Sequence, residues 1–531
     1  MQLIHNIVHI IFAIALLVYL FVALRYELQM LQQNSYRNDR FLRWLRSSGT
    51  LSSPRSLTLY FLLLLYCSSF APFATTIIEA IIAITLFIFS IRELRTHYKK
   101  PVVFTHRAIR LYTAAWVVTT VITLAIASIG TPEAQQYTAA LTLIAILAFP
   151  WVIMLCANTL MQPIEKLINR GFYNEAKKIL ADMPHLTIIG ITGSYGKTST
   201  KHYLYRILSE KYNVIMTPGS YNTPMGVIRT VREMMKPYYD VFIVEMGAKQ
   251  IGDIKEICDL VAPSIGIVTA VGEQHLESFK TIENVQRTKF ELIDALPSDG
   301  LGVLNNDFPY IASRPVSNVS VLRYALEAGN ADFHIEDIVY DDIETRFTIV
   351  GDGHKLALST QLVGDCNLSN LMAAVIVALH LNVPENAIKY AVSRIEQVEH
   401  RLNIKRAPGG LSIIDDAFNS NPDGARMALD VLNRVRATRR IVITPGMIEL
   451  GDKQDEYNHR FGEQRAAVAD YVMIVGTYNR AAILEGLQAG GMKEEAIFLA
   501  DSFTTAQARL VQIARAGDVV LYENDLPDTF K

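Results

Sequence analysis

The strongest chemical signal in the sequence is a glycine-rich stretch that ends in a lysine and a threonine. Residues 190–198 read GITGSYGKT and begin inside the apolar run LTIIGIT at 186–192. Glycines let backbone N–H groups converge on phosphate oxygens, the lysine neutralises charge, and the threonine hydroxyl reaches Mg²⁺. The stretch therefore predicts a phosphate-binding loop, although Ile191 stands where the general pattern requires glycine; a strand, turn and helix without nucleotide is the alternative. The expected phosphate contacts are Gly193, Ser194, Tyr195, Gly196, Lys197 and Thr198.

Two further side chains follow apolar runs that read as buried strands. Glu245 lies in VFIVEMGA (241–248), where a buried carboxylate is costly unless it binds a metal or accepts hydrogen bonds. His275 follows SIGIVTAV (264–271), at the carboxyl edge where open α/β sheets place their ligands. A surface carboxylate and a structural histidine are the alternatives. We expect both side chains to share one sheet edge with the loop.

Short motifs continue in order through most of residues 185–525. They are PGSYNTPMGV (218–227), VFIVEMGA (241–248), VGEQHLESF (271–279), RTKFELI (287–293), LNND (304–307), GDCNLSNLMAA (364–374), HRLN (400–403), IIDDAFNSNP (413–422) and TPGMIELG (444–451). With the loop, this series resembles the Mur ligase family, the ATP-dependent amide-bond ligases of peptidoglycan synthesis. Within the family, the likeness is greatest to the type that adds D-alanyl-D-alanine to the UDP-linked tripeptide.

The resemblance implies two Mg²⁺ ions beside the loop. Thr198 and Glu245 would hold one ion, and Glu245 and His275 would help to hold the second. Lys289, within TKFEL, matches a family lysine that CO₂ carbamylates, so that it becomes an anion supporting a metal site. A solvated lysine on a charged helix is the alternative that the residues alone suggest. Lys197, His275 and Lys289 are the expected catalytic residues.

The resemblance also implies nucleotide contacts outside the loop. Asn305 and Asn367 match family positions that bind ATP. Arg401 and Asp415 belong to the last domain and are expected to reach the ATP site from there.

The sequence departs from the family pattern in several places. The family's usual first domain, which grips the UDP of the substrate, has no counterpart. Cys366 replaces a commonly seen histidine, and His400 replaces a glycine before the HRLN arginine. The end of the chain, LYENDLPDTFK (521–531), is not the basic, serine-bearing segment of the D-alanyl-D-alanine-adding enzymes. Asp525 and Asp528 could meet a cationic amine substrate or could form a solvated tail.

The secondary structure expected around these residues predicts an α-helical membrane domain followed by two α/β domains. Strand-like runs alternate with helical ones after residue 401, which is typical of a Rossmann-like domain. Residues 332–364 alternate like antiparallel strands and belong to the central domain. The expected domains are a membrane domain at 1–160, a linker helix at 161–184, a central ATP-binding P-loop ligase domain at 185–400 and a Rossmann-like C-terminal domain at 401–531.

Long apolar runs fill the first part of the chain. They lie at 5–24, 56–71, 74–91, 110–129 and 138–159. A helix needs roughly 17–25 such residues to cross a membrane. Because segments 25–55 and 92–110 are rich in arginine and the other connections lack Lys and Arg, five spans place the N-terminus outside and the ligase domains in the cytoplasm. A buried hairpin over 56–91 that does not fully cross is the alternative.

Composition narrows the function classes further. A net charge of −2 argues against a nucleic-acid surface, and four scattered cysteines argue against a zinc ribbon or a disulfide scaffold. The sequence thus predicts a ligase of the cytoplasmic membrane that uses ATP to join a cell-wall precursor, which could be lipid-linked, to an amino acid or dipeptide amine. A membrane-anchored poly-γ-glutamate synthetase and an ATP-gated scaffold or transport subunit are the alternatives; the apolar runs hold almost no charges, which a solute pathway would usually show.

Overall fold

The computed structural model describes residues 2–69, 72–98, 100–129, 131–340, 344–417 and 421–526. It divides into two compact units, of which one extends to Asn169 and the other spans Arg170–Asp525. Asp525 is described, whereas Asp528 lies outside the described residues.

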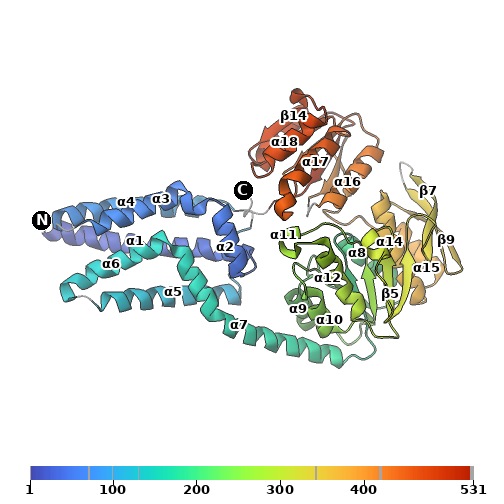
Figure 1. Cartoon of the computed structure of the whole chain (residues 1–531), viewed down its shortest axis with the longest axis horizontal. Helices are drawn as coiled ribbons and strands as arrows, with labels where there is room; N and C mark the ends of the chain where they lie inside the picture. Colours follow the sequence, from blue (N-terminus) through green and yellow to red (C-terminus); the bar gives the residue numbers. More distant parts are fainter. Residues whose placement is uncertain are drawn as a thin grey trace. The chain divides into compact units, whose positions relative to one another are not determined.

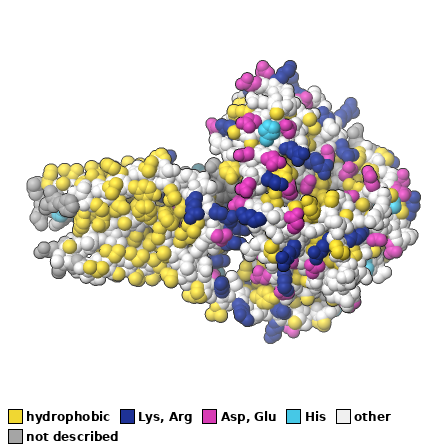
Figure 2. All heavy atoms as spheres, viewed as in Figure 1, with side chains coloured by type: hydrophobic (Ala, Val, Ile, Leu, Met, Phe, Trp, Pro, Cys, Tyr) yellow, Lys and Arg dark blue, Asp and Glu magenta, His cyan; other side chains and the backbone are white. Residues whose placement is uncertain are grey.

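The first unit is built from helices alone (Figure 1). Helix α1 packs against α4 and α5, and α6 packs against α3 and α5. The unit exposes many Ile, Leu, Val and Phe side chains, and Figure 2 shows them covering much of its visible surface. Its elements are α1 (Gln2–Gln33), α2 (Asn38–Ser47), η1 (Thr50–Ser52), α3 (Pro54–Cys67), α4 (Pro72–Arg95), α5 (His106–Ala127), α6 (Pro132–Ala148) and the first part of α7 (Pro150–Ala181), whose residues from Arg170 on belong to the second unit.

Three of these helices are long and apolar enough to cross a membrane, namely Leu3–Gln33, Phe73–Arg95 and His106–Ala127. The apolar run at 56–71 forms only the 14-residue helix α3, about 21 Å long at 1.5 Å per residue. A hydrocarbon core is about 30 Å thick. The five-span arrangement therefore stays a prediction.

The apolar run at 138–159, which we expected to form one span, is not one continuous helix. The run is divided between α6 and α7, which meet at an angle of 86°. The break lies at Phe149, whose backbone (φ −130°, ψ 53°) is not helical. Pro150 explains the break, because the residue before a proline is kept out of the helical region and proline itself has no N–H to donate.

The second unit contains two sheets, which define a central lobe and a C-terminal lobe (Figure 1). The central sheet has the order β2-β3-β1-β4-β5-β6-β7-β8-β9, parallel from β2 to β7 and antiparallel from β7 to β9. The predicted antiparallel strands after residue 332 are thus confirmed. The strands of this sheet are β1 (Thr187–Thr192), β2 (Val214–Met216), β3 (Val241–Glu245), β4 (Ile265–Val268), β5 (Leu301–Asn305), β6 (Ser320–Tyr324), β7 (Phe333–Tyr340), β8 (Thr345–Gly351) and β9 (His354–Thr360).

Helices cover both faces of the central sheet. Phe242 and Val244 of β3 belong to the hydrophobic core shared with α9, α10 and α12, while Val241 and Ile243 belong to the core shared with α8, α14 and α15. Strands buried on both faces explain the nearly continuous apolar runs in the sequence. The helices of this lobe are α8 (Lys197–Leu208), α9 (Pro224–Met234), α10 (Asp253–Val261), α11 (Leu276–Phe279), α12 (Ile282–Asp294), α13 (Pro309–Ala312), α14 (Asp365–His380) and α15 (Glu385–Ser393).

The C-terminal lobe has a sheet of order β10-β11-β15-β12-β13-β14, parallel except for the β10–β11 pair. This arrangement agrees with the predicted Rossmann-like domain. Its elements are β10 (Asn403–Ala407), β11 (Leu411–Asp416), α16 (Pro422–Arg434), β12 (Arg440–Thr444), η2 (Gly451–Lys453), α17 (Gln454–Ala466), β13 (Tyr471–Val475), α18 (Arg480–Ala489), η3 (Glu494–Ala496), β14 (Ile497–Ala500), α19 (Phe503–Ile513) and β15 (Val519–Glu523).

Candidate active site

The predicted phosphate loop joins β1 to α8 at the carboxyl edge of the central sheet. Helix α8 begins at Lys197, so the loop lies at a helix N-terminus, where backbone N–H groups are free to bind an anion. Gly196 caps the helix with φ 80°, and a Cβ atom at this position would collide with the side chain of Asn370. The glycine is therefore required both by the backbone and by the close approach of α14.

Lys197 lies over the loop that it is expected to serve. Its Nζ atom donates to the carbonyl oxygens of Gly193 (2.6 Å) and Ser194 (3.2 Å). Burial lowers the pKa of Lys197 to about 8; Glu245 opposes this shift, and the positive charge of Arg401 adds to it. A phosphate bound at the loop would favour the charged ammonium, because an opposite charge within a few ångströms stabilises it.

Glu245 is the last residue of β3 and is only 1% exposed, so the surface-carboxylate alternative is excluded. Thr198 Oγ1 donates to its Oε1 at 3.2 Å, and Asn222 Nδ2 donates to the same oxygen at 3.1 Å. Lys201 Nζ lies 2.9 Å from Oε2. Burial would raise the pKa of Glu245, but Lys201 and then Lys197 lower it, so the carboxylate is held ionised. Thr198 and Glu245 are thus brought together as predicted.

Lys201 is a residue that sequence reasoning missed. It is completely buried in α8, one turn after Lys197, and its Nζ atom also donates to the carbonyl of Gly219. The usable signal was a second lysine four residues after the first, because residues four apart lie on one face of a helix.

His275 directly precedes α11 and Lys289 lies on α12, and both helices follow β4 in the chain. His275 precedes α11 in a left-handed conformation (φ 53°), and its Nδ1 contacts Glu449 Oε2 of the C-terminal lobe. Lys289 of α12 is 2% exposed, which excludes the solvated alternative. Burial lowers the pKa of Lys289 well below its ordinary value, and Lys197 lowers it further. No hydrogen bond or ion pair of its Nζ atom is found within the described part of the chain.

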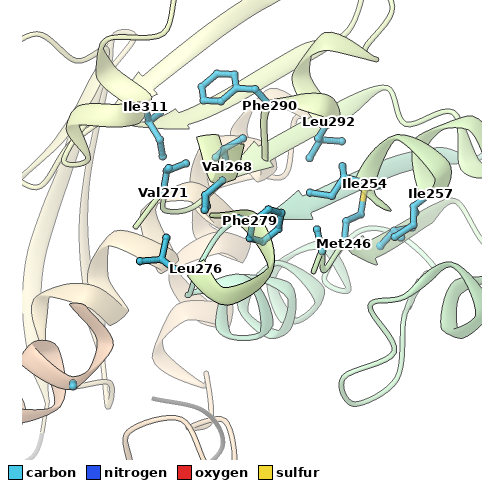
Figure 3. Close-up of a cluster of buried hydrophobic side chains, with 14 of the residues drawn as sticks. Met246, Ile254, Ile257, Val268, Val271, Leu276, Phe279, Phe290, Leu292 and Ile311 are labelled. Atoms are coloured by element: carbon cyan, nitrogen blue, oxygen red, sulfur yellow. The ribbon is translucent and has the colours of Figure 1, made fainter. Parts of the chain in front are cut away.

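A hydrophobic cluster fixes these two helices. Figure 3 shows Leu276 and Phe279 of α11 and Phe290 of α12 lying in the same apolar cluster as Val268 and Val271. Leu276 directly follows His275, and Phe290 directly follows Lys289. Packing of these apolar neighbours therefore fixes the backbone positions of His275 and Lys289.

A pocket of about 180 Å³ lies beside the loop, and Asn305, an expected nucleotide contact, is among the residues that line it. Asn367 does not line it. Its amide instead accepts from Tyr203 and donates to the Val363 carbonyl, both at 2.9 Å. Asn370, one turn later on α14, is the asparagine on the pocket wall. The pocket is lined by Tyr195, Thr269, Asn305, Asp307, Phe308, Leu326, Gly364, Asp365, Cys366, Ser369, Asn370, Arg426, Met427, Asp430 and Val431.

The C-terminal lobe contributes Arg401, and its two adjacent aspartates have different partners. Asp415 is bound to His400 Nδ1 (2.9 Å) and lies 3.4 Å from Lys405 Nζ. Asp416 is the aspartate whose charge acts on Arg401, and burial raises the pKa of Asp416 to about 8 although Arg401 opposes the shift. Arg401 also lies within electrostatic range of Glu245. Asp416, which interacts with Arg401, is therefore a better candidate than Asp415 for linking the C-terminal lobe to the phosphate loop.

His400 stands where the family commonly has glycine, and the structure gives a reason for the glycine. His400 has a φ of 58°, in the left-handed region that favours glycine. The imidazole ring of His400 contacts Asp415, a contact that glycine at this position could not make.

Comparison with known proteins gives a family for this arrangement. The family "Mur ligase middle domain" matches residues 191–378, and "Mur ligase, glutamate ligase domain" matches residues 400–522. A UDP-N-acetylmuramoyl-tripeptide–D-alanyl-D-alanine ligase of Mycobacterium bovis is 32% identical over 361 residues, which cover 63% of this chain and 70% of the relative. The chain belongs to the Mur ligase family. The Bacillus subtilis enzyme of the same name is 28% identical, over 63% of this chain and 72% of that protein.

The fold of this Mur ligase agrees with solved relatives. The crystal structure of the MurF ligase of Thermotoga maritima in complex with ADP superposes with a TM-score of 0.61 at 25% identity, covering 67% of this chain and 80% of that one. The predicted ligase class is confirmed: the protein is an ATP-dependent, ADP-forming carboxylate–amine ligase with central and C-terminal α/β domains. The helical unit before residue 170 lies outside both family matches.

Proposed function

We propose that this Mur ligase joins a carboxylate of a peptidoglycan precursor to an amino acid or dipeptide amine. The observation that carries the proposal is the cluster of Lys197, Thr198 and buried Glu245 at the carboxyl edge of β1 and β3. The mycobacterial and Bacillus relatives are D-alanyl-D-alanine-adding ligases of a UDP-linked tripeptide, which supports a donor and an acceptor of this chemistry.

In the proposed reaction, an oxygen of the donor carboxylate attacks the γ-phosphorus of ATP and ADP leaves, which gives an acyl phosphate. The amine nitrogen then attacks the acyl carbon, the bond from carbon to the phosphate oxygen breaks, and the nitrogen loses a proton as the amide forms. Lys197, together with Arg401 from the C-terminal lobe, would place positive charge near the transferring phosphoryl group. Such fixed charges stabilise the transition state of phosphoryl transfer.

The residues fit Mg²⁺ at the loop, because hydroxyl and carboxylate oxygens are the ligands this ion prefers. Thr198 and Glu245, 3.2 Å apart, would hold one ion, and Glu245, His275 and Lys289 would take part in holding a second. When bound, Mg²⁺ would neutralise charge on the phosphate oxygens. The described residues contain no group of three or more His, Cys, Asp or Glu side chains that could hold a metal, and an anion in addition to Glu245 would strengthen a second site.

A carbamate on Lys289 would supply that anion. The low pKa of Lys289 favours the neutral amine, which is the form that adds CO₂ and releases a proton. The burial of Lys289, together with an Nζ atom for which no hydrogen bond or ion pair is found in the described chain, is consistent with such a modification.

We further propose that the helical unit holds the ligase at the inner face of the cytoplasmic membrane, with the N-terminus outside. The apolar helices and the arginine-rich segments 25–55 and 92–110 support this orientation. In a variant whose native cysteines are serines, single cysteines at Ser68 and Gln135 should react from outside the cell with an impermeant thiol reagent. Cysteines at Ser47 and Thr96 should react only after lysis. All four positions are exposed. Reversed labelling would place the ligase where no ATP is supplied.

The helical unit also suggests the form of the donor. In chain order it precedes the central lobe, where the family's usual UDP-gripping domain is expected. Anchoring enzyme and substrate in one bilayer raises the effective concentration of the substrate, as a tether does. We therefore propose a donor carried on a membrane lipid.

The full-length enzyme in lipid nanodiscs tests this proposal with one muropeptide in two forms, linked to UDP or to a polyprenyl diphosphate. We expect kcat/KM to be about 10²-fold higher for the lipid-linked form, with ADP release requiring both donor and amine. Equal use of the two forms would contradict a lipid-linked donor. Release of ADP without any donor would contradict ligation itself.

A further inference from the structure

A carboxylate of the C-terminal lobe reaches the histidine of the central lobe. Glu449 lies in the loop between β12 and α17, and its Oε2 atom contacts His275 Nδ1. Its other oxygen, Oε1, lies 3.3 Å from Lys249 Nζ.

The two lobes meet at several points around this contact. The backbone N–H of Glu277 donates to the Glu449 carbonyl at 3.2 Å, and Lys453 Nζ donates to Glu273 Oε1 at 2.9 Å. Both His275 (φ 53°) and Glu449 (φ 62°) have left-handed backbones, which are unfavourable for residues with a side chain. Such conformations persist only where the surroundings enforce them and are frequent at functional sites.

The contact with Glu449 determines which ring nitrogen of His275 carries the proton. Each ring nitrogen carries either a proton or a free lone pair, and a carboxylate at one nitrogen fixes the proton there. With Glu449 at Nδ1, the lone pair of Nε2 is left to bind a cation. Metal-binding histidines usually donate their other N–H to a carboxylate or carbonyl, and the loss of that partner weakens metal affinity.

We propose that Glu449 is a positioning residue, which sets the tautomer and ring orientation of His275 only when the C-terminal lobe is docked on the central lobe. The inference rests on the metal role proposed above for His275. Docking of the two lobes would then complete the second metal site, because the partner that orients its histidine belongs to the other lobe.

Three variants of the full-length enzyme test the inference: Glu449→Gln, Lys453→Gln and His275→Ala. Glu449→Gln keeps the shape of the side chain and removes its charge. Lys453→Gln is the matched control, since it removes a different ion pair between the lobes, that with Glu273, without touching His275. The measurement is the number and affinity of bound Mn²⁺ ions, counted by electron paramagnetic resonance with a non-hydrolysable ATP analogue. Mn²⁺ binding at the loop shows that each variant is folded.

We expect two Mn²⁺ ions in the wild type and in Lys453→Gln. Glu449→Gln should bind the first ion normally and the second about 10–100-fold more weakly. A normal second ion in Glu449→Gln would overturn the inference, and so would equal weakening in Lys453→Gln, because Glu449 would then only hold the lobes together. If His275→Ala binds both ions normally, the proposed metal role of His275 is wrong, and the inference falls with it.

Discussion

Replacing Lys197 with alanine should reduce ATP-dependent ligation by about 10²–10³-fold, the usual cost of removing one fixed charge or donor from a transition state. The lysine lies over the phosphate loop with its Nζ atom on the Gly193 and Ser194 carbonyls, from which it can turn to a bound phosphate. The rate of ADP release at saturating donor and amine measures the effect.

Lys211→Ala is the matched control for this variant. Lys211 follows α8, is exposed, and donates to the carbonyls of Leu381 and Asn382. Lys211→Ala should keep the wild-type rate, and both variants should show unchanged thermal unfolding. Near-normal turnover of Lys197→Ala would show that the loop does not bind the transferring phosphate.

Lys289→Ala should lose activity by about 10²-fold or more, because the charge stabilisation that metal ions provide is worth several kcal/mol. The substitution opens space in a buried site, so short carboxylates such as formate or acetate should enter it and restore part of the rate. Steady-state rates with and without these anions measure the rescue.

Lys289→Met distinguishes the loss of the anion from the loss of side-chain volume. Methionine fills the space with an apolar chain, so this variant should be inactive and should not respond to acetate. The wild type should lose activity in buffer freed of CO₂ and regain it on addition of bicarbonate. Wild-type activity in Lys289→Ala would rule out the carbamate.

The parts of the site that follow directly from strand ends could be predicted from the sequence. The loop after β1 and Glu245 at the end of β3 were found in this way, because parallel strands bring their carboxyl ends to one edge. Lys201 was missed, because its spacing from Lys197 predicts that the two lysines share a helix face but not that this face meets Glu245 at the end of β3.

Two expected nucleotide contacts show the limit of motif matching. Asn367 and Asn370 lie one turn apart on α14, and only the packing against Tyr203 turns the first away from the pocket. Asp415 and Asp416 are adjacent in β11, so their side chains point to opposite faces of the sheet. A resemblance that covers both residues cannot decide which one faces Arg401.

The helical unit shows a similar limit at a larger scale. Hydropathy identified the apolar segments, but a run of apolar residues does not show where the chain bends between two helices. The bend of 86° between α6 and α7 is local backbone chemistry at Phe149 and Pro150. Contacts between the lobes, such as Glu449 with His275, join residues 174 positions apart and leave no local pattern.

The most direct test of ligation through an acyl phosphate uses a donor whose carboxylate is labelled with heavy oxygen. During amide formation by the full-length enzyme, one labelled oxygen should pass from the donor to inorganic phosphate for each amide bond formed. Mass spectrometry of the released phosphate measures the transfer. Amide formation with unlabelled phosphate, or with the label in AMP, would contradict the proposed mechanism.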